Sequence, residues 1–303
     1  MTPVDFLLGM PRSGSSWLGA QLDRAPGLAV FGETSFFGRY RVAPRGDGRY
    51  GASELARVKR VQSGRTWAAT TGVPSGVRVD GPVWREIVDE AVDEGGETKP
   101  AAVFRSLAGG VARHTGASRT LEKTPHHVLA GVELATRFPE ARFVVTRREP
   151  YGFVRSLHHA GRRRTRRSRV SDLQRHPALC ALVWRRYAQA IDALAAYVPR
   201  RVLIVDNDSM RRRPSATIEQ VAGFLGVAPP PPSEAMANSS FAGAPPPLGA
   251  DEVFWVNTLL RDQGTRPVPR PRASLLTSVA SLPAAAGVAL LFLGRDRLRT
   301  GLP

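Results

Sequence analysis

The sequence predicts an α/β protein whose parallel sheet is doubly wound and flanked by helices, in a single main domain. Short apolar runs have the length and composition of buried strands; they lie at 4–9, 27–33, 141–150 and 200–208. Segments with helical spacing follow these runs; they lie at 15–25, 84–94, 100–114, 151–160 and 215–227. Strands that alternate with helices are typical of a parallel sheet, and 303 residues are enough to bury a substantial core.

The first of these strands runs into the stretch FLLGMPRSGSSWL, residues 6 to 18. Gly9 and Gly14 have the spacing of a phosphate-binding loop, and strand, glycine loop, helix is the order that such a loop requires. We therefore expect a fold of the P-loop NTPase type. Ser15 stands where a nucleotide-hydrolysing loop has its lysine, which disfavours contact with a γ phosphate. Side-chain donors suited to a single phosphate group are Arg12, Ser13, Ser15 and Ser16.

The formal charge of +17 is concentrated between residues 142 and 213, which contain 18 arginines and 5 acidic residues. The run GRRRTRRSR at 161–169 has six arginines and no acid. Such a segment suits nucleic acid, an anionic ligand or anionic lipid, but it also fits the compositional bias of an arginine-rich chain with only three lysines. The single cysteine, Cys180, excludes an internal disulfide and favours the cytoplasm, and the N-terminus has no signal-peptide pattern.

The composition changes after residue 228, so we expect a main domain at 1–228 and a proline-rich strap or linker at 229–273. The remainder, 274–303, is an apolar tail in which 274–294 carries no charge. That segment exceeds the ~18 residues that a membrane span needs. It is either a membrane-inserted or interfacial tail, which would give peripheral membrane contact, or a helix packed on the domain.

Two stretches of this sequence are PRSGSSW at 11–17 and Arg148-Glu149-Pro150 followed by Ser156. They resemble signatures of the sulfotransferases that use 3′-phosphoadenosine-5′-phosphosulfate (PAPS). Residues 11–17, PRSGSSW, match the family's 5′-phosphosulfate loop, P-[KR]-S-G-[TSN]-[TS]-W. Arg148-Glu149-Pro150 ends a predicted strand and is followed by Ser156, eight residues after the arginine, as in the family's second signature around R-[DN]-P. Glu149 departs from the usual Asp or Asn.

Two further stretches agree with this resemblance. LEKTPHHV at 121–128 resembles a segment of the bacterial and tyrosylprotein-type branches, whose catalytic base is a carboxylate. NDSMRRRPSATIEQVAGFLGV at 207–227 resembles the family's Y-E-D-L segment and its F-L-G ending, with Asn207-Asp208 in place of Tyr-Glu. The similarity covers about residues 4–230, in the family's order.

The resemblance implies that PAPS is the donor and that no metal ion is needed. The residues that would hold its 5′-phosphosulfate are Arg12, Ser13, Gly14, Ser15, Ser16 and Trp17. Arg148 and Ser156 would bind the 3′-phosphate, because an arginine fork and a serine hydroxyl suit phosphate oxygens. Trp17 would either stack near the cofactor or pack in the core. The adjacent pairs His126–His127 and His158–His159 cannot easily converge on one ion.

For catalysis the resemblance favours Glu33, after the second strand, as the base that takes the acceptor's proton. His126 is the rival base. Arg12 and Lys123 would stabilise the bridging oxygen and the sulfonate as the sulfuryl group moves.

The acceptor would be a hydroxyl of a small molecule or a glycolipid, and the sequence specifies neither its identity nor the oligomeric state. Three segments would select it: a long loop or lid at 39–82, in which we expect one helix, the loop 161–178 and the proline-rich tail. One alternative is a Mg²⁺-dependent kinase-like enzyme, with Asp206 as a Walker B aspartate. Another is a basic nucleic-acid-binding protein, but this leaves both signatures unexplained, so we expect no nucleic-acid partner.

Overall fold

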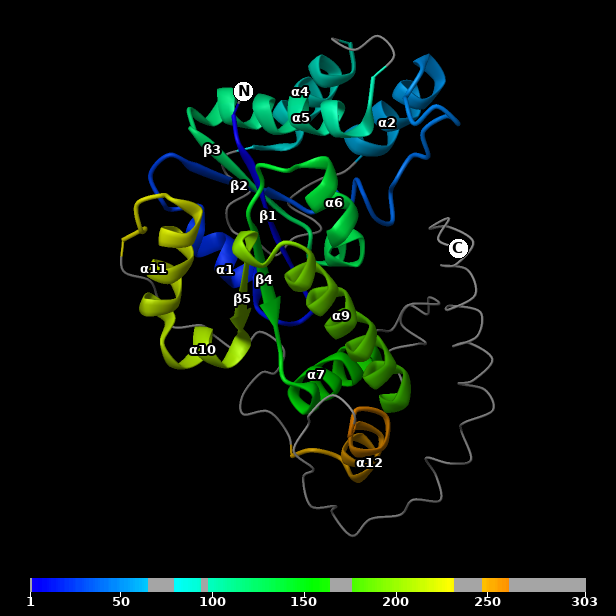
Figure 1. The fold of residues 1–303 in the computed structure, drawn as a ribbon, viewed down its shortest axis with the longest axis vertical. Helices are drawn as coiled ribbons and strands as arrows, with labels where there is room; N and C mark the ends of the chain where they lie inside the picture. The colour runs from blue at the N-terminus through cyan, green and yellow to red at the C-terminus, as the bar shows by residue number, and fades with distance from the viewer. Residues whose placement is uncertain (1, 65–78, 94–97, 164–175, 232–246, 262–303) are drawn as a thin grey trace. The chain divides into compact units, whose positions relative to one another are not determined.

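The computed structural model describes residues 2–64, 79–93, 98–163, 176–231 and 247–261 (Figure 1). Two compact units make up the chain. The first comprises residues 1–147 and 189–236, and the second comprises 148–188 and 237–303. The apolar segment 274–294 lies outside the described residues. Among the helices that are described, none is long and apolar enough to cross a membrane.

The first unit is built on a sheet of five parallel strands, in the order β2-β3-β1-β4-β5. Their bounds are β1 Val4–Gly9, β2 Leu28–Gly32, β3 Arg119–Lys123, β4 Phe143–Arg147 and β5 Val202–Asp206. Four of them are the strands that the apolar runs predict. Strand β3, with the sequence RTLEK, was not predicted, because three of its five residues are charged. It nevertheless lies next to the central strand, and Glu122 and Lys123 at its end are buried.

Helices flank the strands as the alternating pattern predicts (Figure 1). In the first unit they are α1 Ser15–Leu22, α2 Ala52–Ser63, α4 Gly81–Asp93, α5 Pro100–Thr115, α6 Gly131–Arg137, α10 Asn207–Arg212 and α11 Pro214–Leu225, with 3₁₀ turns η2 Pro125–Ala130 and η3 Pro199–Arg201. Helix α2 is the helix expected within the long loop 39–82. Helix α9, Pro177–Tyr197, has residues in both units.

The two faces of the sheet have different cores, because successive strand side chains point to opposite sides. On one face Phe6 stacks on Phe104 of α5 and on Phe143 of β4, with ring centroids 5.7 Å and 5.5 Å apart. Burying each ring contributes roughly 1.5–3 kcal/mol. The other face is aliphatic and is covered by α1, α10 and α11; its core includes Leu7, Leu121, Val144, Val205, Leu18, Leu22, Met210, Ile218 and Val221. Register places Glu122 beside Phe6 and Phe31 on the aromatic face, so Lys123 points to the face of α1.

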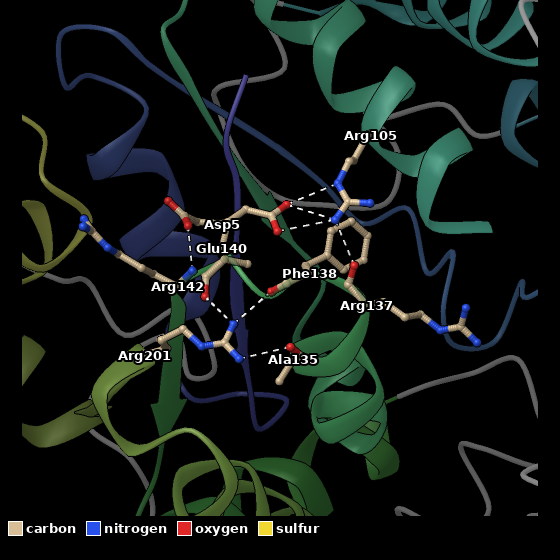
Figure 2. A network of polar contacts seen from close by, with 9 residues as sticks. Asp5, Arg105, Ala135, Arg137, Phe138, Glu140, Arg142 and Arg201 are labelled. Carbon is tan, nitrogen blue, oxygen red and sulfur yellow. Dashed lines mark hydrogen bonds and ion pairs between the residues drawn. The ribbon is translucent and has the colours of Figure 1, made fainter. Parts of the chain in front are cut away.

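A network of arginines lies at the amino-terminal edge of the sheet (Figure 2). Arg201 donates hydrogen bonds to the carbonyls of Ala135, Phe138 and Ala141 at 2.9–3.2 Å. Arg105 binds the Glu140 carboxylate and the carbonyl of Arg137, and it lies over the ring of Phe138. These contacts fix the end of α6 and the turn into β4.

A buried carboxylate, Asp5 of β1, belongs to the same edge. It accepts hydrogen bonds from the Arg142 N–H at 2.7 Å (Figure 2) and from the Arg119 guanidinium at 2.5 Å. Burial raises the pKa of Asp5 in spite of these two donors. The N-terminal strand is thereby tied to β3 and to the start of β4.

In the second unit, α7 Pro150–Arg163 packs against α12 Ala250–Leu259. Tyr151 donates a 2.5 Å hydrogen bond to Asn257, and Nδ1 of His158 lies 2.8 Å from the Glu252 carboxylate. Helix α12 falls within the segment 229–273 that the sequence predicts as a proline-rich strap. These two polar contacts are about two turns apart along α7, so they fix the position of α12 along that helix.

Candidate active site

The glycine loop leaves the carboxyl end of β1, the central strand, and ends at the first residue of α1. Arg12 and Gly14 have positive φ angles, 64° and 97°, whereas Ser13 between them does not. Alternation of this kind turns successive N–H groups toward one side and makes an anion-binding concavity. Gly14 is also the N-cap of α1 and supplies no side-chain cap. The N–H groups and the dipole at a helix start favour an anion.

The loop is held from below by contacts that the sequence did not predict. The hydroxyl of Ser13, fully buried, lies 2.6 Å from that of Thr146 at the end of β4 and donates to the Met10 carbonyl at 2.5 Å. Asn207, the first residue of α10, donates from Nδ2 to the Ser13 carbonyl at 2.9 Å. Gly9 is required, because a Cβ there would lie 2.2 Å from the Thr146 carbonyl oxygen. Ser13 is thus an anchor of the loop rather than an exposed donor.

Lys123 and Glu33, two of the residues that the sequence analysis assigns to catalysis, lie next to each other beside this loop. The Lys123 ammonium lies 2.7 Å from the Glu33 carboxylate and donates to the Ser16 hydroxyl at 3.3 Å. The Lys123 side chain is 1% exposed, whereas that of Glu33 is 26% exposed. The Lys123 side chain also packs against α1 at Gly19, where a Cβ would lie 3.6 Å from its Cγ. A buried cation and a solvent-accessible carboxylate therefore meet at the first turn of α1.

His126, the rival base, lies within electrostatic range of the same pair. The protein around its imidazole disfavours the charged form and lowers the pKa of His126, and the cations Lys123 and Arg39 act in the same direction. The negative charge of Glu33 opposes them. The pKa of His126 is therefore lowered on balance, and its ring lies close enough to the Glu33 carboxylate for the two charges to interact.

Other sequence candidates of the first unit have different surroundings. Arg12 is exposed at the top of the loop. Trp17 is partly buried and packs against the aliphatic core, which favours the packing interpretation. Asp206, the candidate Walker B aspartate, is half exposed and forms an ion pair with Arg147 at 3.1 Å. In the described part of the chain no three His, Cys, Asp or Glu side chains are grouped so that they could hold a metal ion.

Arg148 and Ser156 belong to the second unit and share a face of α7. The Arg148 Nε lies 3.2 Å from the point where a Cβ on Gly152 would stand. Ser156 is four residues further along the helix, so it lies one turn above Gly152 on the same side. Both residues are buried, Arg148 at 9% exposure and Ser156 at 0%. The eight-residue spacing therefore directs an arginine and a hydroxyl toward one patch of α7.

The structure explains the departure at Glu149. Its carboxylate accepts hydrogen bonds from the N–H groups of Tyr151 and Gly152, at 2.8 and 2.5 Å. These N–H groups belong to the first turn of α7, which begins at Pro150. An Asp or Asn at this position would be expected to cap the helix in the same way. Glu149 thus keeps the capping function, and Trp184 fixes the preceding backbone by donating to the Arg148 carbonyl at 2.8 Å.

Comparison with known proteins bears on this arrangement. Residues 3–231 match the model of the sulfotransferase family. No curated protein matches the chain significantly. The sulfotransferase domain of an olefin synthase from Synechococcus PCC 7002 is 17% identical, with 94% of each chain covered and a TM-score of 0.46. The sulfotransferase domain from the curacin biosynthetic pathway is 15% identical, covering 94% of this chain and 98% of that one, with a TM-score of 0.49.

A sulfotransferase from Mycobacterium avium is 15% identical, covering 97% of this chain and 76% of that one, with a TM-score of 0.46. The family match covers both predicted signatures, the glycine loop at 11–17 and Arg148 with Ser156. It also includes the Lys123–Glu33 pair, and its limits agree with the range of about 4–230 that the motifs define. The chain belongs to the sulfotransferase family.

Proposed function

We propose that this chain transfers the sulfuryl group of PAPS to a hydroxyl acceptor, a small molecule or a glycolipid, and releases adenosine 3′,5′-bisphosphate. The observation that carries the proposal is the Lys123–Glu33 pair, 2.7 Å apart, beside a glycine loop with positive φ at Arg12 and Gly14. PAPS would supply an activated sulfuryl group on a phosphate leaving group.

The glycine loop would bind the 5′-phosphate end of the donor. Its concave N–H groups and the dipole of α1 favour an anion, and Ser15, at the lysine position of a nucleotide-hydrolysing loop, is buried. Trp17 would hold the helix against the core rather than stack on the ligand. The hydroxyl of Ser16, which accepts a hydrogen bond from Lys123, lies at the start of the same helix.

Arg148 and Ser156 would bind the 3′-phosphate, the group that distinguishes PAPS from ATP. Their common face on α7 supports this assignment, because a guanidinium and a hydroxyl one turn apart can reach oxygens of one phosphate. Glu149, by capping α7, would keep the start of that helix in place.

Glu33 would act as the base that takes the proton from the acceptor hydroxyl. Its carboxylate is partly exposed, so an incoming hydroxyl can reach it. The salt bridge to Lys123, 2.7 Å long, holds the carboxylate in place. When the sulfuryl group moves, Lys123 and Arg12 would stabilise the negative charge on the bridging oxygen and the sulfonate.

The ligand preference of the protein tests this proposal directly. We would measure thermal unfolding with adenosine 3′,5′-bisphosphate or with ADP, each with and without Mg²⁺. A ligand at 100 times its dissociation constant stabilises by about 2.7 kcal/mol, which raises the melting temperature by a few degrees. We expect the shift with the 3′-phosphate compound alone and independently of Mg²⁺.

Two neighbouring arginines give a matched pair of variants. Arg148→Gln should abolish the shift, whereas Arg147→Gln, which removes only the exposed ion pair with Asp206, should retain it. A shift with ADP and Mg²⁺ alone would contradict the proposal and favour a kinase. A shift with neither nucleotide would leave binding of nucleic acid to the basic segment as the next hypothesis.

A further inference from the structure

The four residues after Glu33, Thr34 to Phe37, have an unusual backbone. They connect the candidate base to the rest of the chain, and Ser35 has a φ angle of +47°. A non-glycine residue pays a strain cost in this left-handed region, so the surroundings must hold it there. Both Thr34 and Ser35 are buried, at 1% and 7% exposure.

One carboxylate collects the polar contacts of this segment. Glu122, on β3 next to Lys123, is completely buried. Its Oε1 accepts from the Thr34 N–H at 3.3 Å, from the Thr34 hydroxyl at 2.8 Å and from the Thr124 hydroxyl at 2.5 Å. Its Oε2 lies 3.1 Å from Nδ1 of His127. These are four donors for one carboxylate, from the three residues Thr34, Thr124 and His127.

Each of the three side chains also accepts a hydrogen bond from the segment. Thr124 accepts from the Ser35 N–H at 3.4 Å, and Thr34 accepts from the Phe36 N–H at 3.3 Å. His127 accepts on Nε2 from the Phe37 N–H at 3.2 Å. All four consecutive N–H groups, residues 34 to 37, are therefore connected to Glu122, the first directly and the others through one side chain each.

This pattern fixes the state of His127. A backbone N–H can only donate, so Nε2 of His127 carries no proton. Its proton is then on Nδ1, where it is donated to Glu122. The imidazole therefore has one orientation, and the ring of Phe37 packs edge-on against it, with ring centroids 5.8 Å apart.

We propose that Glu122 is the positioning residue for Glu33: with His127, Thr34 and Thr124 it holds segment 34–37, and thereby the Glu33 carboxylate, against the Lys123 ammonium. Glu122 and Lys123 are adjacent on β3 and point to opposite faces of the sheet. The strand thus controls both partners, Lys123 by its own side chain and Glu33 through the hydrogen bonds of Glu122. The consequence for catalysis rests on the proposed function, whereas the role of Glu122 in holding Glu33 against Lys123 does not.

The three lysines of the chain allow a test that needs no substrate. In protein with ¹³C at lysine Cε, NMR gives three resonances, for Lys59, Lys99 and Lys123, and loss of one peak in Lys123→Arg assigns it. Removing the negative partner in Glu33→Gln defines the shift of the unpaired Lys123 ammonium. We expect Glu122→Gln to move the Lys123 resonance at least half of the way to that position.

Asp5→Asn is the matched control, because it neutralises another fully buried strand carboxylate of the same sheet at the opposite edge. It should leave the Lys123 resonance unchanged. If Glu122→Gln does not fold, Thr34→Val removes one of the donors at similar volume and should move the resonance in the same direction. A folded Glu122→Gln or Thr34→Val protein with an unchanged Lys123 resonance would overturn the proposal.

Catalytic measurements separate this proposal from the previous one. With PAPS as donor and water as acceptor, Glu122→Gln should lower the rate of adenosine 3′,5′-bisphosphate release at least tenfold and leave the affinity for that product within twofold. Loss of affinity together with an unchanged rate would argue against a positioning role. If the wild type neither binds the product nor turns over PAPS, the proposed function fails while the NMR result stands.

Discussion

The two edges of the sheet use charged residues in opposite ways. At the amino edge, Arg201 and Arg105 bind backbone carbonyls and a carboxylate of neighbouring turns, and the contacts hold the chain together (Figure 2). At the carboxyl edge, Lys123 is buried but its partner Glu33 is open to solvent, beside a loop with positive φ angles. The arginines at the amino edge stabilise the fold, whereas Lys123 at the carboxyl edge lies next to a surface that a ligand can reach.

The two edges also differ in the pKa values of their buried carboxylates, Asp5 and Glu122. Burial raises the pKa of Asp5 at the amino edge even though Arg119 and the Arg142 N–H donate to it. Burial by itself would also raise the pKa of Glu122, but the surrounding donors, His127 first among them, outweigh it and lower the pKa. A fully buried carboxylate is thus stable in its charged form only where enough donors surround it. In this sheet such donors surround Glu122, behind the candidate site.

Replacing the buried cation at the carboxyl edge should have the largest effect. Lys123→Met is expected to lower the rate of PAPS turnover by about 10²–10³-fold, since one preorganised charge on the transition state is lost. The free energy of unfolding should change by less than about 1 kcal/mol, because Met retains the packing and water can solvate Glu33. Lys59→Met, at an exposed ion pair with Asp89, is the control and should change neither. Rates measured with denaturant unfolding curves check both expectations.

The opposite outcome is expected at the amino edge. Arg201→Met removes charge-assisted hydrogen bonds to three backbone carbonyls and should lower the free energy of unfolding by about 2 kcal/mol. The rate of PAPS turnover by the folded protein should stay within threefold of the wild type. Urea unfolding and a rate measurement below the transition test this. If Arg201→Met lowered the rate of PAPS turnover as much as Lys123→Met does, the proposed difference between the two edges would be wrong.

Loosening the glycine loop should have an intermediate effect. Asn207→Leu removes the donor to the Ser13 carbonyl and retains the approximate volume. We expect the affinity for adenosine 3′,5′-bisphosphate to fall about tenfold, which corresponds to about 1.4 kcal/mol. Isothermal titration calorimetry would measure it. Replacement of the exposed neighbour in Asp208→Asn serves as the control; equal affinity loss in both variants would mean that α10 as a whole, not the Asn207 contact, supports the loop.

The smallest effect is a change in the pH dependence of stability. A carboxyl with a lowered pKa stabilises the fold above its unfolded pKa, near 4.5 for Glu122, and that stability is lost as the pH falls below it. Asp5, with a raised pKa, has the opposite sign: its contribution is present below about 3.8 and is lost as the pH rises through its folded pKa. Glu122→Gln should therefore flatten the acid limb of the stability curve, and Asp5→Asn should steepen it. Unfolding free energies at several values between pH 3 and pH 7 check both signs.

Much of this protein follows from its sequence alone. Continuous apolar runs predict four of the five strands, because a buried parallel strand needs no alternation. The glycine loop, the pair Arg148 and Ser156, and Lys123 with Glu33 were identified from motifs, and the structure brings Lys123 and Glu33 together. Local signals suffice for the strands and the glycine loop, since a strand, a glycine turn and a helix start are decided by neighbouring residues. Glu33, Lys123, Arg148 and Ser156 were assigned through the family resemblance.

Only the tertiary structure decided which residues support those motifs. Strand β3 is too short and too charged to be read from its sequence; its charges are tolerated because Glu122 receives four donors and Lys123 meets Glu33. Asn207 and Thr146 hold the loop from positions 194 and 133 residues away from Ser13. Hydrogen bonds between residues so distant in the chain leave no periodic pattern, and buried polar groups acquire partners only once the strands have been brought side by side.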